Sequence, residues 1–252
     1  SSSSSSSSSA GSVWNRANVA VWAMGQPKDI LSVFNAMLKT CARCGHWERL
    51  VSVLRVMEQQ QVRADDVAFT TAVSALSHAG QMDLLLEVFG RMRQTGSIKG
   101  SKAYTATVNA VAAHDLDKAV DVFEEGVRDG SLSLFTDSAV CSHVDLHGYS
   151  MAVAMVAVKA AMRHFVAKPE DVSEEGLRLV TGQGKRNKAF PYHSALRPVV
   201  LEALREHGIQ ATVDHDNAGA VYVSKEKLLA SLAMTPNMSA IYHRDCHISP
   251  TS

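Results

Sequence analysis

The sequence has no excess of charge of either sign. Its 25 Lys and Arg balance its 25 Asp and Glu, so the formal net charge is zero. Residues 29–131 hold 11 cationic and 13 anionic side chains, and residues 143–232 hold 11 and 10. Proteins that bind nucleic acid usually carry a basic surface. Any such surface in this protein must therefore be a local patch.

Cysteines and long apolar runs are also scarce. Four cysteines among 252 residues do not make a disulfide framework. Cys41 and Cys44 form the motif CARC, but Cys141 and Cys246 stand singly, so no second pair completes a zinc site. We therefore expect no metal ligands. No apolar run reaches the roughly 18 residues that span a bilayer, so no membrane partner is expected either.

The chain opens with nine serines and has no initiator methionine, which indicates a fragment or a processed form. A polyserine tract cannot bury apolar surface, so residues 1–12 are expected to be disordered. Organellar transit peptides are rich in both serine and arginine. Because the first arginine is Arg16, the tract is only a weak indication of targeting.

A repeat with a period of 35 residues fills the first half of the chain. Aromatic residues, turn glycines and methionines recur at this spacing: Phe34, Phe69 and Tyr104; Gly45 and Gly80; Met57 and Met92. Within each unit two apolar stripes follow the i, i+3, i+4, i+7 pattern of an amphipathic helix. The pattern predicts an α-helical solenoid of helix pairs over residues 13–131, with units near 32–66, 67–101 and 102–131. Residues 13–24 are expected to be a helix left from an earlier unit.

The units resemble the pentatricopeptide repeat family. The resemblance rests on "VFNAMLKTCARCGHWERLVSVLRVMEQQQVRAD" and "VAFTTAVSALSHAGQMDLLLEVFGRMRQTG". The tetratricopeptide repeat differs in its period of 34 residues and in its sequence pattern. The family binds single-stranded RNA with about one base per repeat.

The resemblance also implies which residues read the bases, because the fifth and the last residue of each repeat dominate recognition. Counted from Ser32 and Val67, these positions are Ala36 with Asp66, Thr71 with Ser101, and Ala106. Alanine cannot hydrogen-bond a base edge, so only Thr71 and Ser101 are expected to read one. A structural or protein-binding solenoid remains the alternative.

After Gly130 the pattern changes. Residues 132–141 read as a linker, and residues 142–233 alternate short strands with helices. The predicted order is β-α-β-α-β-β, a small two-layer α/β sandwich. Its strands are expected at residues 144–147, at 177–181 and in "IQATVDHD" and "GAVYVS", which "DNAG" joins as a hairpin. Residues 234–252 read as a flexible tail.

Two short motifs in this half carry candidate chemistry. In "VDLHG", Asp145 and His147 lie two residues apart on a predicted strand and so share a face. A carboxylate beside a histidine holds the tautomer and raises the basicity of the ring, as in a general base. The alternative is a strand end whose side chains satisfy loop amides.

The second motif, "TGQGKRNK", follows a strand. Its glycines allow close approach to a phosphate, and its cations form the densest basic cluster of the chain. The nucleic-acid contacts predicted here are Thr181, Gly182, Gly184, Lys185, Arg186 and Lys188. A solvated basic loop is the alternative. Asp214, His215 and Asp216 lie at the hairpin tip, where turn-forming aspartates are common.

This half resembles the small MutS-related (Smr) domain. That family has the motif L-D-x-H-G, here VDLHG with Val144 in place of leucine, followed by T/H-G-x-G, here TGQG. The resemblance implies nucleic-acid binding and, in some members, endonuclease activity that depends on Asp145 and His147. Pentatricopeptide repeats followed by an Smr domain are typical of plant and algal organelles, so a chloroplast or mitochondrial location is implied.

Two functions follow as hypotheses. The first is a monomeric organellar protein that binds single-stranded RNA and binds or nicks it through the Smr domain, with no cofactor expected and a divalent metal requirement left open. The second is a non-catalytic adaptor, whose solenoid grips a protein and whose Smr domain docks on RNA or a ribosome.

Overall fold

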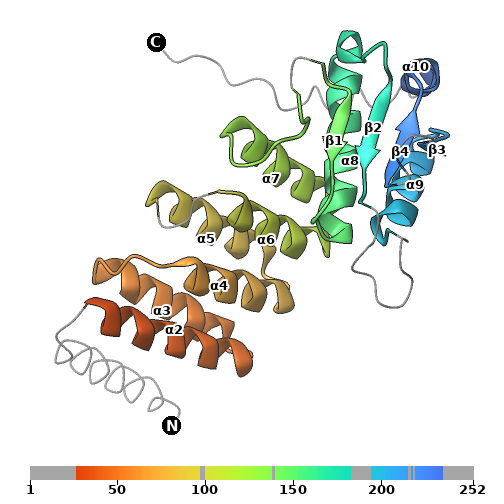
Figure 1. Ribbon diagram of the computed structural model, residues 1–252. Coiled ribbons are helices and arrows are strands. Elements are labelled where there is room, and N and C mark those ends of the chain that lie inside the picture. Colours follow the sequence, from red (N-terminus) through yellow and green to blue (C-terminus); the bar gives the residue numbers. More distant parts are fainter. Residues whose placement is uncertain are drawn as a thin grey trace, which may run out of the picture. The chain divides into compact units, whose positions relative to one another are not determined.

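The computed structural model describes residues 27–96, 100–137, 140–182, 194–214, 217 and 219–234 (Figure 1). The chain forms two compact units, Ser1–Lys99 and Gly100–Ser252. The expected polyserine segment, the helix at residues 13–24 and almost all of the expected tail lie outside the described residues. Among the helices that the structure describes, none combines the length and the apolar character that crossing a membrane requires.

The first unit consists of paired helices, α2 (Pro27–Arg43), α3 (Trp47–Gln59), α4 (Asp66–His78) and α5 (Met82–Gln94). Helix α2 packs on α3 and α4, and α4 packs on α5, as the predicted solenoid requires. The predicted stripes face this core, and in α3, α4 and α5 every stripe residue is buried: Leu50, Val53, Leu54, Met57, Phe69, Ala72, Val73, Leu76, Leu85, Val88, Phe89 and Met92.

The turn inside each helix pair is built the same way in both pairs. Gly45 and Gly80 have a φ of +69°, a left-handed conformation that glycine adopts without steric cost. The residue after each glycine donates its backbone N–H to a carbonyl of the preceding helix, 2.9 Å from His46 to Cys41 and 2.9 Å from Gln81 to Leu76. Such bonds satisfy carbonyls that the end of a helix leaves without partners. The two glycines lie 35 residues apart because the same helix end recurs in each repeat.

The second unit begins with a third helix pair, α6 (Ser101–Ala112) and α7 (Leu116–Arg128), and continues into the α/β layers. These layers contain β1 (His143–Asp145), α8 (Met151–Ala167), the short 3-10 helix η1 (Pro169–Asp171), β2 (Leu177–Val180), α9 (Leu196–Glu206), β3 (Thr212–Val213), β4 (Ala220–Val223) and α10 (Lys225–Met234). The predicted β-α-β-α-β-β order is confirmed. The strand expected in "IQATVDHD" is much shorter than that segment, because β3 is an edge strand that pairs only with β4.

The sheet has the strand order β1-β2-β4-β3 and separates an apolar from a polar face. Strands β1 and β2 are parallel, and β4 is antiparallel to both of its neighbours. Val144, Leu179 and Val221 lie in register and are at most 1% exposed, on the face along which α8 and α9 lie (Figure 1). The next row, His143, Arg178 and Tyr222, is half-buried and alternates to the opposite face.

The third helix pair packs on α8 within the second unit, where both α6 and α7 contact that helix. Arg163 of α8 lies 2.6 Å from a carboxylate oxygen of Asp121 and 3.5 Å from one of Glu124 on α7. The Phe123 and Tyr149 rings meet edge to face, with 6.4 Å between their centroids. The boundary between compact units therefore lies before this helix pair, whereas the sequence pattern placed it after residue 131.

The segment expected to be a linker belongs to the same core. Leu132, Leu134 and Phe135 are each less than 10% exposed. Leu132 also explains a glycine of the third repeat. The first two repeats have Met57 and Met92 near the position where the third has Gly126. A Cβ atom on Gly126 would come within 2.8 Å of both Leu132 and Tyr104. A larger side chain at this position would therefore clash with both.

Replacing Gly176 by alanine should destabilise the second unit strongly. Gly176 precedes β2 with a φ of +73°, and an added Cβ would lie 2.4 Å from the carbonyl oxygen of Val223. The backbone conformation alone costs about 1–2 kcal/mol, and the overlap with rigid backbone adds to it. Gly130 is the matched control, because its φ of +77° is similar but no atom lies within 4 Å of the added Cβ.

Urea unfolding measures this difference. In the sequence the three tryptophans precede residue 100 and the five tyrosines follow it, and the described Trp47 lies in the first unit while Tyr104, Tyr149 and Tyr222 lie in the second, so tryptophan and tyrosine spectra report on separate units. The urea concentration at the midpoint of unfolding, monitored by tyrosine, should fall more in Gly176→Ala than in Gly130→Ala. The midpoint monitored by tryptophan should not change in either variant. Equal shifts in the two variants would show that the predicted overlap relaxes without cost.

Candidate nucleic-acid interface

Asn35 and Asp65 form a polar pair between the first helices of successive repeats. The Asn35 side-chain amide donates to both carboxylate oxygens of Asp65, at 3.3 and 3.1 Å. Asp65 is also the N-cap of α4 and accepts the backbone N–H of Ala68 at 2.8 Å. The other end of the amide, Asn35 Oδ1, is enclosed and has no hydrogen-bond partner among the described residues. Capping and pairing together hold this carboxamide and carboxylate in one geometry.

The observed helix starts move the repeat count by one residue. Helices α4 and α6 begin at Asp66 and Ser101, 35 residues apart, so the fifth positions become Asn35, Thr70 and Thr105. Counted in this way, the last residues of the first and second repeats are Asp65 and Gly100. A count from Ser32 places these positions one residue later and therefore does not select Asn35 and Asp65. An aspartate at a helix N-cap was the available signal for the earlier start.

The other repeats offer less to a base. Thr70 and Thr105 donate their hydroxyls to the backbone carbonyls of Asp66 and Ser101, at 2.7 and 2.9 Å. Of the residues named from the sequence, Thr71 is half-buried and donates its hydroxyl to Val67, while Ser101 is exposed at the start of α6. Ala36 and Asp66 are exposed and Ala106 is half-buried. Among the described residues, only the first repeat therefore presents a paired amide and carboxylate at these positions.

In the second unit, Asp145 and His147 form a contact at the end of β1. His147 Nδ1 lies 2.6 Å from both carboxylate oxygens of Asp145, and the backbone N–H of His147 donates to one of them at 3.0 Å. The strand ends at Asp145, so a turn rather than strand alternation brings the two side chains together. Both are open to solvent, at 42% and 71% exposed. The arrangement orients an accessible imidazole by a carboxylate, as a general base requires.

The two motifs meet at one edge of the sheet. Parallel pairing of β1 and β2 places their carboxyl ends side by side. A Cβ atom built on Gly182 would lie 3.8 Å from the Cβ of His147. Tyr149 lies nearby, and burial, together with the Asp145 charge, raises the pKa of its phenol. The phenol is therefore a neutral donor beside the pair at neutral pH.

Thr181 anchors this edge from inside. Its side chain is buried, and its hydroxyl donates to the carbonyl of Gly219 at 3.0 Å while Ser194 donates to the Thr181 carbonyl at 2.7 Å. The hydroxyl predicted to contact nucleic acid is thus engaged in holding β2 to the loop before β4. Gly184, Lys185, Arg186 and Lys188 lie outside the described residues, as do His215 and Asp216.

Asp214 belongs to a polar network on the open face of the sheet. Its carboxylate is 6% exposed and accepts from Arg178 Nε. The same guanidinium lies 3.1 Å from His143 Nε2, and His143 Nδ1 lies 2.8 Å from the Ser142 hydroxyl. The network joins β1 and β2 to the end of β3. Asp214 is therefore a buried ion-pair partner, a contact that the sequence could not indicate across 36 residues.

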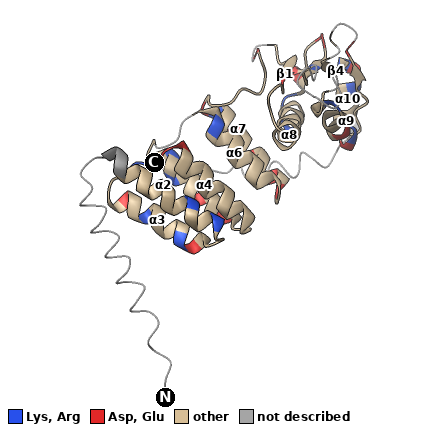
Figure 2. Cartoon of the chain, turned by 60° about the horizontal axis from the view of Figure 1, so that its bottom comes forward, with Lys and Arg blue, Asp and Glu red and all other residues tan. Residues whose placement is uncertain are grey.

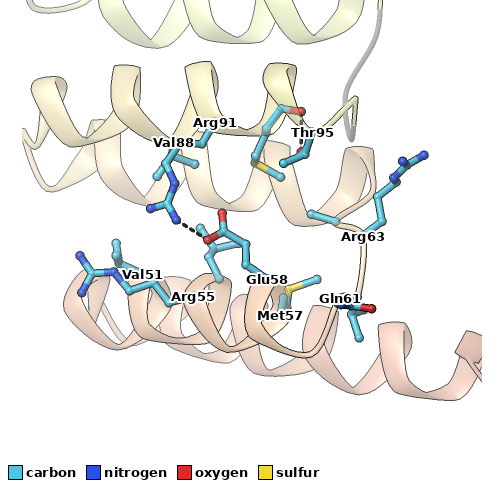
Figure 3. Close-up of a pocket in the computed structure, with 13 residues that line it drawn as sticks. Val51, Arg55, Met57, Glu58, Gln61, Arg63, Val88, Arg91 and Thr95 are labelled. Atoms are coloured by element: carbon cyan, nitrogen blue, oxygen red, sulfur yellow. Dashed lines mark hydrogen bonds and ion pairs between the residues drawn. The ribbon is translucent and has the colours of Figure 1, made fainter.

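The first unit also contains a cavity of about 240 Å³ between α3 and α5 (Figure 3). Apolar side chains such as Met57, Val88 and Met92 line it, together with Arg55 and Arg63. Arg91 and Glu58 form an ion pair beside it, and each is 41% exposed. Basic and acidic side chains alternate over the helices rather than gathering into one stripe (Figure 2). No extended basic track is evident on the described helices.

Comparison with known proteins identifies the helix pairs. A family model described as pentatricopeptide repeat-containing protein matches residues 32–155, the stretch that holds the second helix pair, the third and nearly all of the first. Residues 32–155 are therefore similar to the pentatricopeptide-repeat family over just under half of the chain. The match ends inside α8, so it does not cover β2, β3 and β4.

Two curated relatives agree with the pentatricopeptide-repeat match. A chloroplastic pentatricopeptide repeat-containing protein of Arabidopsis thaliana is 31% identical over 91 residues, which is 36% of this chain. A second pentatricopeptide repeat-containing protein of the same plant is 27% identical over 97 residues, which is 38% of this chain. The aligned part covers 16% of the length of each relative.

Proposed function

We propose that this protein binds single-stranded RNA in a plant-type organelle. Its pentatricopeptide repeats would hold the RNA, and its C-terminal α/β layers, which resemble an Smr domain, would bind or nick it. The organelle is inferred from the relative whose name describes it as chloroplastic. The basic cluster Lys185, Arg186 and Lys188, which follows β2 in the sequence, would contact phosphates. It would supply a local positive charge in a chain whose net charge is zero.

The Asn35–Asp65 pair carries the RNA-binding proposal. The Asp65 carboxylate and the Asn35 amide nitrogen fixed beside it can match a base edge, in the way that asparagine and aspartate recognise bases elsewhere, whereas the enclosed Asn35 Oδ1 is not offered to a base. The pair occupies the fifth and last positions of a pentatricopeptide unit once the unit is counted from the observed helix start. Thr70, Thr71, Ser101 and Thr105 would add weaker polar contacts.

The nicking proposal rests on the edge where the motifs VDLHG and TGQG meet. His147 would take a proton from a ribose 2′-hydroxyl or from water, and Asp145 would hold its ring in the productive tautomer. The accessible imidazole and the neighbouring Gly182 leave room for a phosphodiester.

A protein-binding adaptor is the second candidate function. The observation that favours it is the cavity between α3 and α5, whose apolar floor and arginines suit a peptide with apolar and acidic residues. The described part of the three repeats holds one amide–carboxylate pair, which also limits how many RNA bases the repeats could distinguish. In this alternative the α/β layers would dock on RNA or a ribosome without cutting.

Binding of homopolymeric single-stranded RNAs at low salt separates the two functions. The full chain should bind RNA and prefer one homopolymer, and Asn35→Ala should weaken binding to that homopolymer roughly tenfold and lose the preference. Ser52→Ala is the matched control, because Ser52 is exposed on the second helix of the same repeat. No binding to any homopolymer by the full chain would contradict the proposal and favour the adaptor.

A further inference from the structure

Three metal-ligating side chains come together in the second unit, away from Asp145 and His147. They are Cys141 before β1, His164 in the last turn of α8 and Asp171 in η1. The Cys141 sulfur, a ring nitrogen of His164 and a carboxylate oxygen of Asp171 all lie within 4.8 Å of one another. His164 Nε2 is 2.8 Å from Asp171 Oδ2. Cys141 lies more than 20 residues before His164 and Asp171, so only the fold brings its sulfur to the other two donors.

The surroundings of this cluster are those of a metal centre. Cys141 is 5% exposed, and the side chains of His164 and Asp171 are 26% and 33% exposed. Phe135 packs edge to face on the His164 ring, at 5.2 Å between centroids, and also contacts Phe165. An apolar wall of this kind lowers the local dielectric and strengthens metal–ligand bonds. His164 also lines an open cavity of about 750 Å³ next to α7, which provides an entry path.

The backbone at Cys141 is consistent with a functional constraint. Its φ of +48° lies in the left-handed region, which residues other than glycine rarely adopt. Its backbone N–H donates to the Asp137 carbonyl at 3.0 Å, so a local turn holds the residue in this conformation. The turn directs the segment that leads into β1. Strain of this kind concentrates where a side chain must be placed for a ligand.

We propose that Cys141, His164 and Asp171 form a zinc site. A thiolate, an imidazole and a carboxylate are all ligands that Zn²⁺ takes, whereas Mg²⁺ and Ca²⁺ prefer oxygen ligands alone. One thiolate and one carboxylate would neutralise the two charges of the ion. Water would complete the tetrahedron as the fourth ligand.

Binding requires a small, balanced change at the cluster. The Cys141 thiol loses its proton to solvent, the sulfur–zinc bond forms, and one proton is released for each zinc ion bound. A cysteine thiol with an ordinary pKa is mostly protonated at neutral pH, so zinc replaces its proton on binding. With metal–ligand bonds of about 2.0–2.2 Å, His164 Nε2 and Asp171 Oδ2 must move apart by roughly 0.5 Å. Asp171 lies in a short 3-10 helix that can accommodate such a shift.

Three protein ligands and a water are the ligand set of a zinc site with an open position, but this cluster lies away from Asp145 and His147, so its role would be to hold the fold, which goes beyond the proposed RNA function. It would fasten the chain that enters β1 to the end of α8, four residues ahead of Asp145. The zinc would therefore fix the strand from which the Asp145–His147 turn projects. Loss of zinc is expected to leave the pentatricopeptide-repeat contacts intact, so failure of this inference would not touch the RNA-binding proposal.

Titration of the full chain with Co²⁺ and Zn²⁺ tests the site. The protein carries three other cysteines, so the measurement uses a Cys41→Ser, Cys44→Ser, Cys246→Ser background in which Cys141 is the only thiol. One equivalent of Co²⁺ should produce a thiolate-to-cobalt absorption band, and Zn²⁺ should displace it. Calorimetry in buffers of different ionisation enthalpy should show about one proton released per zinc ion.

Removing a ligand should weaken zinc binding by at least about 100-fold in Cys141→Ser and in Asp171→Asn. Asp171→Asn keeps the size of the side chain, and circular dichroism of the metal-free variants checks that both fold. Absence of the cobalt band in the single-thiol background would overturn the proposal. So would a zinc affinity that is unchanged in both Cys141→Ser and Asp171→Asn, because it would place the metal elsewhere.

Discussion

The RNA cleavage that we propose for the C-terminal layers should fall by at least about 100-fold when His147 is replaced by alanine, with RNA binding retained. General acid–base catalysis by a positioned side chain typically contributes 10²–10⁴-fold in rate. His147 is 71% exposed, and among the described residues its hydrogen bonds stay within the turn, so its removal should leave the fold of the sheet intact. The measurement is the single-turnover rate on a labelled single-stranded RNA with protein in excess.

The carboxylate can be tested separately from its structural contact. Asp145 accepts the backbone N–H of His147 as well as facing its ring. Asp145→Asn keeps an acceptor for the turn but removes the negative charge, so cleavage should fall while the turn persists. Asp117→Ala, an exposed carboxylate at the start of α7, is the matched control and should cut at the parental rate. Parental rates in both His147→Ala and Asp145→Asn would exclude this pair as the catalytic site.

Replacing Arg178 by methionine should lower the free energy of unfolding of the second unit by about 3 kcal/mol. The change removes the cation that faces the Asp214 carboxylate, which is 6% exposed. Breaking a buried pair by removing one partner costs about 3–5 kcal/mol, because a buried charge loses its compensation. The lower end applies here because the Arg178 side chain is 34% exposed and water screens part of the interaction.

Two further variants make this result specific. Arg205→Met removes a guanidinium whose ion pair with Glu202 is exposed at 77% and 53%, so its effect should be within about 0.5 kcal/mol. Arg178→Met combined with Asp214→Asn should recover part of the lost stability, since no buried carboxylate remains. Urea unfolding monitored by tyrosine absorbance gives the three values. Equal losses in Arg178→Met and Arg205→Met would mean that the Asp214 pair is screened like a surface pair.

The helix pairs could be predicted because their information is local. A period of 35 residues, stripes at helical spacing and glycines at the turns all lie within one unit, and the stripes of α3, α4 and α5 are buried as expected. The order of strands and helices in the second half was equally local. The Asp145–His147 contact was foreseen, but through strand alternation, and the structure makes it through a turn instead.

What could not be predicted depends on contacts between distant segments. Arg178 and Asp214 meet across 36 residues because β2 and β3 flank β4. Cys141, His164 and Asp171 follow no ligand spacing in the sequence and converge only in the fold. The packing of the third helix pair on α8 was not predicted for the same reason, although α8 carried a signal. Its residues are almost all apolar, and a helix that is apolar on every side must be covered on more than one side.

The packing of α6 and α7 on α8 determines which segment must move together when the α/β layers are joined to another helical-repeat array. The third helix pair is a repeat by its sequence, yet it is part of the C-terminal unit by its contacts. A chimera joined after residue 131 would strip α8 of the helices that cover it and would cut away Leu132 from Gly126 and Tyr104. A joint before Gly100 would keep that core whole. Recombination that moved the sheet to another solenoid would therefore have had to carry one repeat with it.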